Sequence, residues 1–414
     1  MKKIVFFILA LVFLFSSLNL TDSIVGTYGI YIVYIFLSGL LILPIFTVKK
    51  EIKINIPTVE IMYLFFMFCL ISSMVNADFK TIISSFMILN LFIVSCIILP
   101  RLNLEINKIL VYSVLISHIP IVLFPLIING FDTMPYKGIF YNPNSFGSIL
   151  ATIFVILLAA ILGNLENIIK GASKKLDRLS ILFLGAMLIY TLYLISLSSS
   201  RTSFLSAIIS LFVGIAFLMW HLIKEKKIVS LLKRGVIFIV GSTIFYILIN
   251  KFTALDKALY SSIFYKFEMS THQDGGVLSG RGNIWVEAIS NAGFFGKGKG
   301  FFSEIGYGAH NTFISIIGNY GWIPLILFFL FLIILFYYCV SYAISNTSDI
   351  YKYLPLLMCI SFLTMSMGEE MIFKLNMLVM FFSFGSIFQR KWMLNRNLYI
   401  LNTKGNKAGD YYHA

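Results

Sequence analysis

The chain has 414 residues, of which 59% are hydrophobic, 16% are aromatic and only 12% are charged. Because a soluble domain carries about a quarter charged residues, this composition excludes a soluble enzyme, a disordered chain and a secreted scaffold held by disulfides. The net charge of +14 would suggest nucleic acid in a soluble chain. Membrane proteins, however, concentrate Lys and Arg in cytoplasmic loops, so we expect a polytopic membrane protein that binds no nucleic acid.

Apolar stretches long enough to cross a hydrocarbon core of about 30 Å recur along the whole sequence. They predict an all-α integral membrane protein with about 12 transmembrane helices. The predicted spans are 4–20, 24–47, 58–75, 81–99, 108–129, 144–163, 179–197, 202–223, 235–250, 311–341, 353–368 and 371–388. The tenth is long, and the glycines at Gly318 and Gly321 predict a break within it.

One large loop separates the ninth and tenth spans. The resulting parts are transmembrane helices one to nine (1–250), an extracytoplasmic loop (251–310), transmembrane helices ten to twelve (311–388) and a basic cytoplasmic tail (389–414). Within the loop, apolar residues spaced three and four apart from Phe252 to Phe267 predict an amphipathic helix on the membrane surface. A second short helix is expected from Asn283 to Asn291.

The distribution of Lys and Arg predicts the orientation of the chain. If the N-terminus is cytoplasmic and the sides alternate, 22 of the 32 Lys and Arg residues fall on the cytoplasmic side. Most of the others lie in the 251–310 loop, whose length weakens the rule. We therefore expect both termini in the cytoplasm and this loop outside.

Two arginines stand on the outer side, where the same rule disfavours positive charge. Arg201 follows three serines at the start of the eighth span, and hydroxyl groups beside a helix N-terminus favour an anion. Arg281 lies between two glycines just ahead of the expected short helix, and its planar guanidinium suits bidentate phosphate contacts. The alternatives are an interfacial anchor for Arg201 and a flexible loop residue for Arg281.

His310 is the candidate proton acceptor, because the ordinary pKa of histidine is about 6.5. It precedes Asn311 at the mouth of the tenth span, where a capping role is the alternative. Glu369 and Glu370 close the eleventh span on the same side. One of them is an alternative base, unless both are solvated.

Asn142 and Asn144 flank a proline ahead of the sixth span, where they either cap the helix or offer amides to sugar hydroxyls. Together with Arg201, Arg281 and His310 they come from four distant stretches that fall on one membrane face. This convergence favours a single site. That face has no Asp/Glu cluster suited to a divalent metal, and the four cysteines lack metal-binding spacing, so we expect neither a metal nor a cofactor.

Four short runs on the outer side carry a resemblance to a known family. They are Y-N-P-N-S at 141–145, S-S-S-R-T at 198–202, S-G-R-G-N-I-W at 279–285, and A-H-N-T-F-I followed by G-N-Y-G-W at 309–322. In this order they resemble the O-antigen ligase and polymerase family of bacterial surface-polysaccharide assembly. The resemblance in architecture covers essentially the whole chain, whereas the motifs are confined to these runs.

The resemblance implies a metal-independent, inverting glycosyltransferase at the outer leaflet of the bacterial inner membrane. Its donor would be a glycan linked to undecaprenyl diphosphate, with Arg201 and Arg281 binding the diphosphate and His310 as the catalytic residue. Asn142, Asn144, Asn311 and Trp285 would bind or position the glycan. Partners would be the lipid-linked donor and acceptor, membrane lipids and, as a candidate, a chain-length regulator protein.

Four functions remain open from the sequence. A polymerase of O-antigen or capsular repeat units is the first, because it is the commoner task. A ligase that transfers the glycan to a lipid acceptor is the close alternative, and a peptidoglycan-type polymerase is the distant one. A flippase or other transporter is the alternative of a different class. Transporters place charged or broken segments near the middle of the membrane, whereas the candidate residues here lie at the outer rim.

Overall fold

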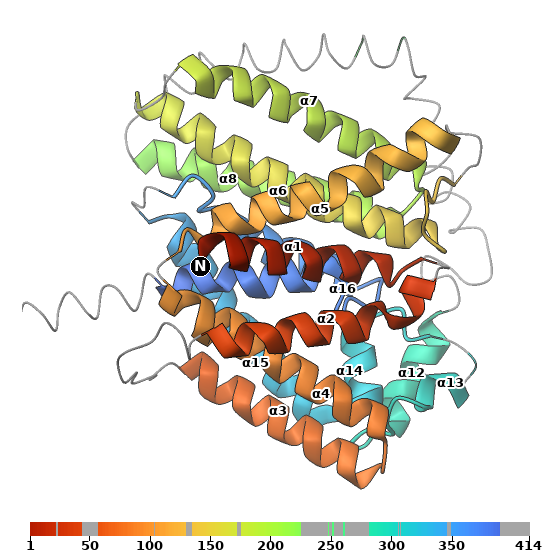
Figure 1. Cartoon of the computed structure of the whole chain (residues 1–414). Coiled ribbons are helices and arrows are strands. Elements are labelled where there is room, and N and C mark those ends of the chain that lie inside the picture. The colour runs from red at the N-terminus through yellow and green to blue at the C-terminus, as the bar shows by residue number, and fades with distance from the viewer. Residues whose placement is uncertain are drawn as a thin grey trace, which may run out of the picture.

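The computed structural model describes residues 1–21, 24–43, 57–102, 104–129, 135–171, 175–224, 281–304, 306, 308–345 and 349–389, with the single residues 247, 251 and 260. These residues form helices joined by turns, as the all-α prediction requires (Figure 1). The first half contains α1 (Lys2–Leu18), α2 (Ile24–Ile42), α3 (Pro57–Val75), α4 (Phe79–Phe92), α5 (Ile106–Asn129), α6 (Pro143–Lys170), α7 (Lys175–Leu197) and α8 (Arg201–Lys224). The second half contains α12 (Arg281–Asn291), α13 (Phe301–Glu304), α14 (Thr312–Tyr320), α15 (Trp322–Ala343), α16 (Leu354–Ser366) and a last helix at Leu375–Gln389.

Seven of the described helices are long and apolar enough to cross a membrane. Three shorter apolar helices accompany them at Tyr28–Ile42, Leu354–Ser366 and Leu375–Gln389. A helical membrane protein is therefore supported, while the number of twelve spans stays a prediction. Apart from the single residues 247 and 260, the predicted ninth span and the amphipathic helix between Phe252 and Phe267 lie outside the described residues, as does most of the tail.

The tenth span is broken where its glycines predicted. α14 ends at Tyr320 and α15 begins at Trp322, and the Gly321 between them has a φ of 93°. A Cβ at this position would lie 2.1 Å from the carbonyl oxygen of Phe294. Gly321 thus permits both the left-handed backbone and the close approach of the Phe294 segment.

α6 is the central helix of the bundle and is buried along its length. Its N-cap is Asn142, whose side-chain oxygen accepts from the backbone N–H of Asn144, and a proline lies in its first turn. It ends at Gly171 in the left-handed conformation, with φ of 78°. α7, α8 and α16 pack around it.

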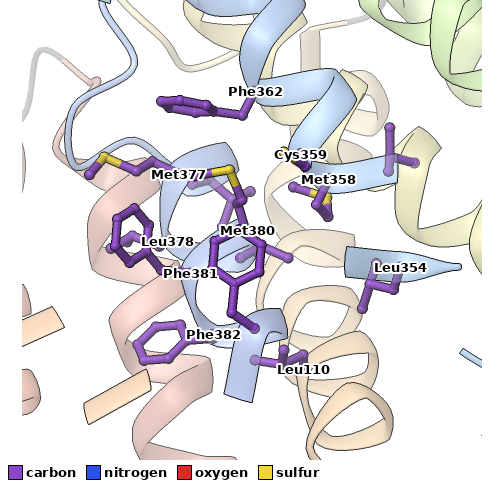
Figure 2. Close-up of a cluster of buried hydrophobic side chains, with 14 of the residues drawn as sticks. Leu110, Leu354, Met358, Cys359, Phe362, Met377, Leu378, Met380, Phe381 and Phe382 are labelled. Carbon is purple, nitrogen blue, oxygen red and sulfur yellow. The ribbon is translucent and has the colours of Figure 1, made fainter. Parts of the chain in front are cut away.

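Bulky side chains fill the core between α5, α16 and the last helix. Figure 2 shows Phe362 and Cys359 of α16 above Met377, Met380 and Phe381 of the last helix. All of these side chains are buried. Methionine adapts its shape to irregular gaps between helices. The four cysteines of the chain are buried and free, as expected of small apolar fillers.

Contacts between helix termini define the two ends of the bundle. At one end, which we call the basic end, Lys2 forms an ion pair with Glu105 and Lys352 forms one with Glu166. At the other, which we call the site end, Thr21 forms a bridge with Phe140. In Figure 1 the N-terminus lies at the left and α12 and α13 at the right.

The predicted end of the sixth span at residue 163 is wrong, because α6 continues to Lys170. The extension carries Glu166, which is 3% exposed, into the bundle. Its Oε1 lies 2.7 Å from both Lys170 and Lys352 and 3.0 Å from His221, and its Oε2 accepts from the Tyr353 hydroxyl at 2.7 Å. These partners offset the cost of burying the carboxylate.

Candidate functional site

Arg201 begins α8 at the site end, directly after the serine turn that joins α7 to α8. Ser200 and Ser203 share a hydrogen bond of 2.8 Å between their hydroxyls. A Cβ on Gly147 of α6 would lie 2.6 Å from the Ser200 Cβ. The start of α6 is therefore packed against the turn that presents Arg201.

Arg281 also begins a helix, because α12 starts at this residue rather than at the expected Asn283. Its side chain is half-buried, and its Nη1 donates to the carbonyl oxygen of Gly368 at 2.8 Å. A Cβ on Gly368 would lie 2.2 Å from the Cγ2 of Thr202, the neighbour of Arg201. Arg281 and Thr202 thus contact Gly368 from two different helices, and Arg201 is the residue before Thr202.

The starts of α8 and α12 are electrostatically unusual. Neither helix has an acidic residue in its first turn, and each places an arginine there instead. A helix N-terminus carries a partial positive charge, so a cation at this position is unfavourable and an anion is favoured. The starts of α8 and α12 are therefore each suited to a bound anion.

His310 lies in the turn before α14 with a φ of 46°, which is uncommon for a residue with a side chain. Burial lowers the pKa of its imidazole, and the positive charge of Arg281 lowers it further. Lys374 acts in the same direction, while Glu369 and Glu370 oppose the shift. The net effect favours a neutral ring near neutral pH, the form that accepts a proton.

Asn311 caps α14, since its side-chain oxygen accepts from the backbone N–H groups of Phe313 and Ile314 at 2.9 and 3.1 Å. Its Nδ2 donates to the carbonyl oxygen of Met367 at 3.1 Å. Both ends of this amide are thus engaged within the chain. Asn311 therefore holds the backbone after His310 in place, and its predicted contact with the glycan stays a prediction.

Trp285 holds the other side of the same turn. From α12 its indole Nε1 donates to the carbonyl oxygen of Ala309 at 3.0 Å. The backbone of His310 is therefore fixed between a bond to Ala309 and the cap at Asn311. One helix, α12, supplies both Arg281 and the tryptophan that orients the histidine turn.

The segment Met367–Met371, which we call the hub, connects these residues. The carbonyl oxygen of Met367 accepts from Asn311, and that of Gly368 accepts from Arg281. The carbonyl oxygen of Glu369 accepts from the hydroxyl of Thr312, which in turn accepts from the backbone N–H of Met371. The sequence predicted a role for Glu369 and Glu370 but not for the backbone around them. Side-chain identity carries no signal for a backbone acceptor, so the hub is visible only in the structure.

The two glutamates of the hub have separate hydrogen-bond partners. Glu369 is 8% exposed, and its Oε1 accepts from Asn144 Nδ2 at 2.8 Å. Glu370 accepts from Ser315 Oγ at 2.8 Å. Asn144 therefore reaches the hub directly, whereas the side-chain oxygen of Asn142 caps α6. The cap predicted for this turn is confirmed, and a contact of either amide with a sugar stays a prediction.

The glycine-rich turn at 296–300, between α12 and α14, is hydrogen-bonded to other parts of the bundle. The N–H groups of Lys297 and Gly298 donate to the carbonyls of Gly318 and Asn319, and that of Lys299 donates to Asp78 Oδ2 at 2.6 Å. These bonds join the turn to the break between α14 and α15 and to the turn between α3 and α4. The turn thus positions α12 relative to the bundle.

A scan against protein-family models finds no family that matches this chain, and a search of curated proteins finds no matching relative. Within the part of the chain that the structure describes, no group of three or more His, Cys, Asp or Glu residues is arranged to hold a metal ion.

Proposed function

We propose that this chain is an inverting glycosyltransferase that polymerises undecaprenyl-diphosphate-linked oligosaccharide repeat units into O-antigen or capsular polysaccharide. One observation carries the proposal. Arg281 donates to the hub directly, Thr202, the residue after Arg201, packs against Gly368 of the hub, and His310 precedes Asn311, which donates to Met367 of the hub. Two cations and a neutral imidazole lie at the same end of a helical bundle with membrane-spanning helices.

This combination of residues fits the chemistry of a lipid-diphosphate donor. The bond between the sugar C1 and the phosphate oxygen breaks, and the electron pair leaves with the diphosphate, whose growing charge two guanidinium groups stabilise. The attacking acceptor hydroxyl must lose its proton, which calls for a base within hydrogen-bond reach. In this scheme His310 accepts that proton, while Arg201 and Arg281 bind the diphosphate.

The residues around the hub would surround the sugars. Asn144 and the carboxylates of Glu369 and Glu370 can exchange hydrogen bonds with sugar hydroxyls. The proposed location is the inner membrane of a bacterium, with the termini in the cytoplasm and the site end facing outside. The charge distribution supports this orientation, because Lys2, Lys170 and Lys352 lie at the basic end.

A ligase that hands the glycan to a lipid acceptor uses the same donor chemistry and is the close alternative. The transporter alternative draws on the Glu166 cluster, because charged residues buried in a membrane bundle often mark ion pathways. Glu166, however, lies in the last turns of α6 with four partners around its carboxylate. That arrangement fits a fixed joint between helices better than a pathway.

The lipid intermediates that accumulate in cells lacking this chain distinguish the functions. A polymerase predicts single repeat units on the lipid carrier, exposed at the outer leaflet. A ligase predicts long chains that remain on the carrier, and a flippase predicts units held at the cytoplasmic leaflet. Accumulation of single exposed units, reversed by the wild-type chain but not by Arg281→Ala, would support the proposal, and either other pattern would contradict it.

A further inference from the structure

Asn144 is hydrogen-bonded to Glu369 of the hub, and this carboxylate has no part in the proton transfer or the departure of the diphosphate proposed above. Glu369 is buried, and among the described residues only Asn144 donates a hydrogen bond to its carboxylate. No Lys or Arg in the described part of the chain forms an ion pair with it. Burying a carboxylate that has only a neutral amide as its partner is costly.

The backbone places residue Glu369 next to the histidine turn. Thr312, two residues after His310, donates its hydroxyl proton to the carbonyl oxygen of Glu369 itself at 3.1 Å. Asn311 is bonded to Met367 in the same segment. The charged groups that act on the His310 ring are Arg281, Glu369, Lys374 and Glu370. Glu369 is the stronger of the two negative ones.

We propose that Glu369, oriented by Asn144, is a positioning residue that stabilises the imidazolium formed on His310. In the reaction proposed above, the acceptor oxygen bonds to C1, its proton moves to the imidazole, and the diphosphate leaves with the electron pair of the broken bond. The positive charge of Arg281 then repels the imidazolium. A fixed carboxylate offsets this repulsion, as a buried carboxylate does for the histidine of a hydrolase triad.

The inference rests on the proposed function, yet part of it can be tested without activity. The full-length chain in lipid nanodiscs, labelled with ¹⁵N-histidine, gives the pKa of His310 by NMR titration, with the resonance assigned from a His310→Gln sample. Glu369→Gln should lower this pKa, because it removes a negative charge and keeps the size of the side chain. Asn144→Ala should shift it in the same direction by less, and Glu370→Gln is the matched control with the smaller effect expected.

Activity supplies the second readout. Glu369→Gln should slow elongation of lipid-linked repeats by about tenfold or more, yet by less than the roughly 10²–10⁴-fold expected when His310 itself is lost. The acidic limb of its pH profile should move to lower pH. An unchanged His310 pKa in Glu369→Gln would overturn the inference. A lowered pKa in a chain that elongates no glycan would instead uphold the pairing and refute the proposed function.

Discussion

Arg281 and Gly368 lie 87 residues apart in the sequence, and a hydrogen bond of 2.8 Å joins the guanidinium of one to the backbone carbonyl of the other. This bond ties α12 to the hub, while Thr202 packs against the same glycine from α8. The relative position of Arg201 and Arg281 therefore depends on one residue that has no side chain.

Substitution of Gly368 tests this dependence. In Gly368→Ala the new Cβ would lie 2.2 Å from the Cγ2 of Thr202, so the hub must shift. Because displacement of a binding group by about 1 Å can cost about 100-fold in rate, we expect at least a tenfold loss of elongation, measured in membranes with lipid-linked repeats.

A second-site change separates this clash from a general defect. Thr202→Ser removes the Cγ2 and leaves the Thr202 Cβ, at 3.6 Å, as the nearest atom. The double variant Gly368→Ala/Thr202→Ser should therefore regain most of the activity. Gly185→Ala, at a glycine with nothing within 4 Å of the added Cβ, is the control. Failure of Thr202→Ser to rescue would show that the contact does not set the arginine geometry.

Replacement of Arg281 by lysine should not be tolerated. Lysine keeps the charge but lacks the planar fork that can bind the Gly368 carbonyl and an anion at once. We expect at least about a tenfold loss of polysaccharide with the protein level unchanged, measured by gel analysis of the product. Lys297→Ala, which removes an exposed cation at the same end, should have little effect. Full activity in Arg281→Lys would reduce Arg281 to a generic positive charge.

Chemical labelling tests the proposed orientation. The four native cysteines are buried, so a cysteine introduced at an exposed position should dominate the signal. An impermeant maleimide added to intact cells should label Lys297→Cys at the site end and leave Lys224→Cys at the end of α8 unlabelled. The reverse pattern would place the candidate site in the cytoplasm and remove the basis for the proposed function.

Much of this architecture follows from sequence patterns that have a direct physical cause. The break at Gly321 follows from a glycine between two apolar runs, and the start of α6 follows from Asn142 and Pro143 as helix-capping residues. Arg281 and His310 were identified by residue type and by charge on the side where charge is disfavoured. These signals are local, so a single sequence contains them.

Other features depend on contacts between distant segments. The predicted span ends at 163, before Glu166, whereas Lys352 and Tyr353, far along the chain, allow Glu166 to be buried and α6 to continue to Lys170. The pairing of Asn144 with Glu369 spans 225 residues. Neither partner indicates the other in one sequence, and the backbone carbonyls of the hub leave no sequence signal.

The rate of glycan transfer should depend on pH through His310. Burial and the charge of Arg281 lower the pKa of its imidazole, so the neutral form that accepts a proton persists to more acidic pH than in an ordinary histidine. The rate should therefore fall only as pH drops below the usual histidine range. Arg281→Gln removes a positive charge, raises the His310 pKa and should move the acidic limb of the residual activity to higher pH. An acidic limb that does not respond to this substitution would argue against His310 as the titrating group.

Reconstitution with a defined donor tests the central claim most directly. The purified chain in lipid nanodiscs would be given undecaprenyl-diphosphate-linked repeat units, and the glycan length and the released undecaprenyl diphosphate would be measured together. We predict one carrier released for each new linkage, chains that grow beyond one repeat, and loss of both products by about 10²–10⁴-fold in His310→Ala while the donor still binds. If His310→Ala elongates chains within about threefold of wild type, His310 is not the general base. If the wild-type chain forms no linkage at all, the chain is not the proposed polymerase.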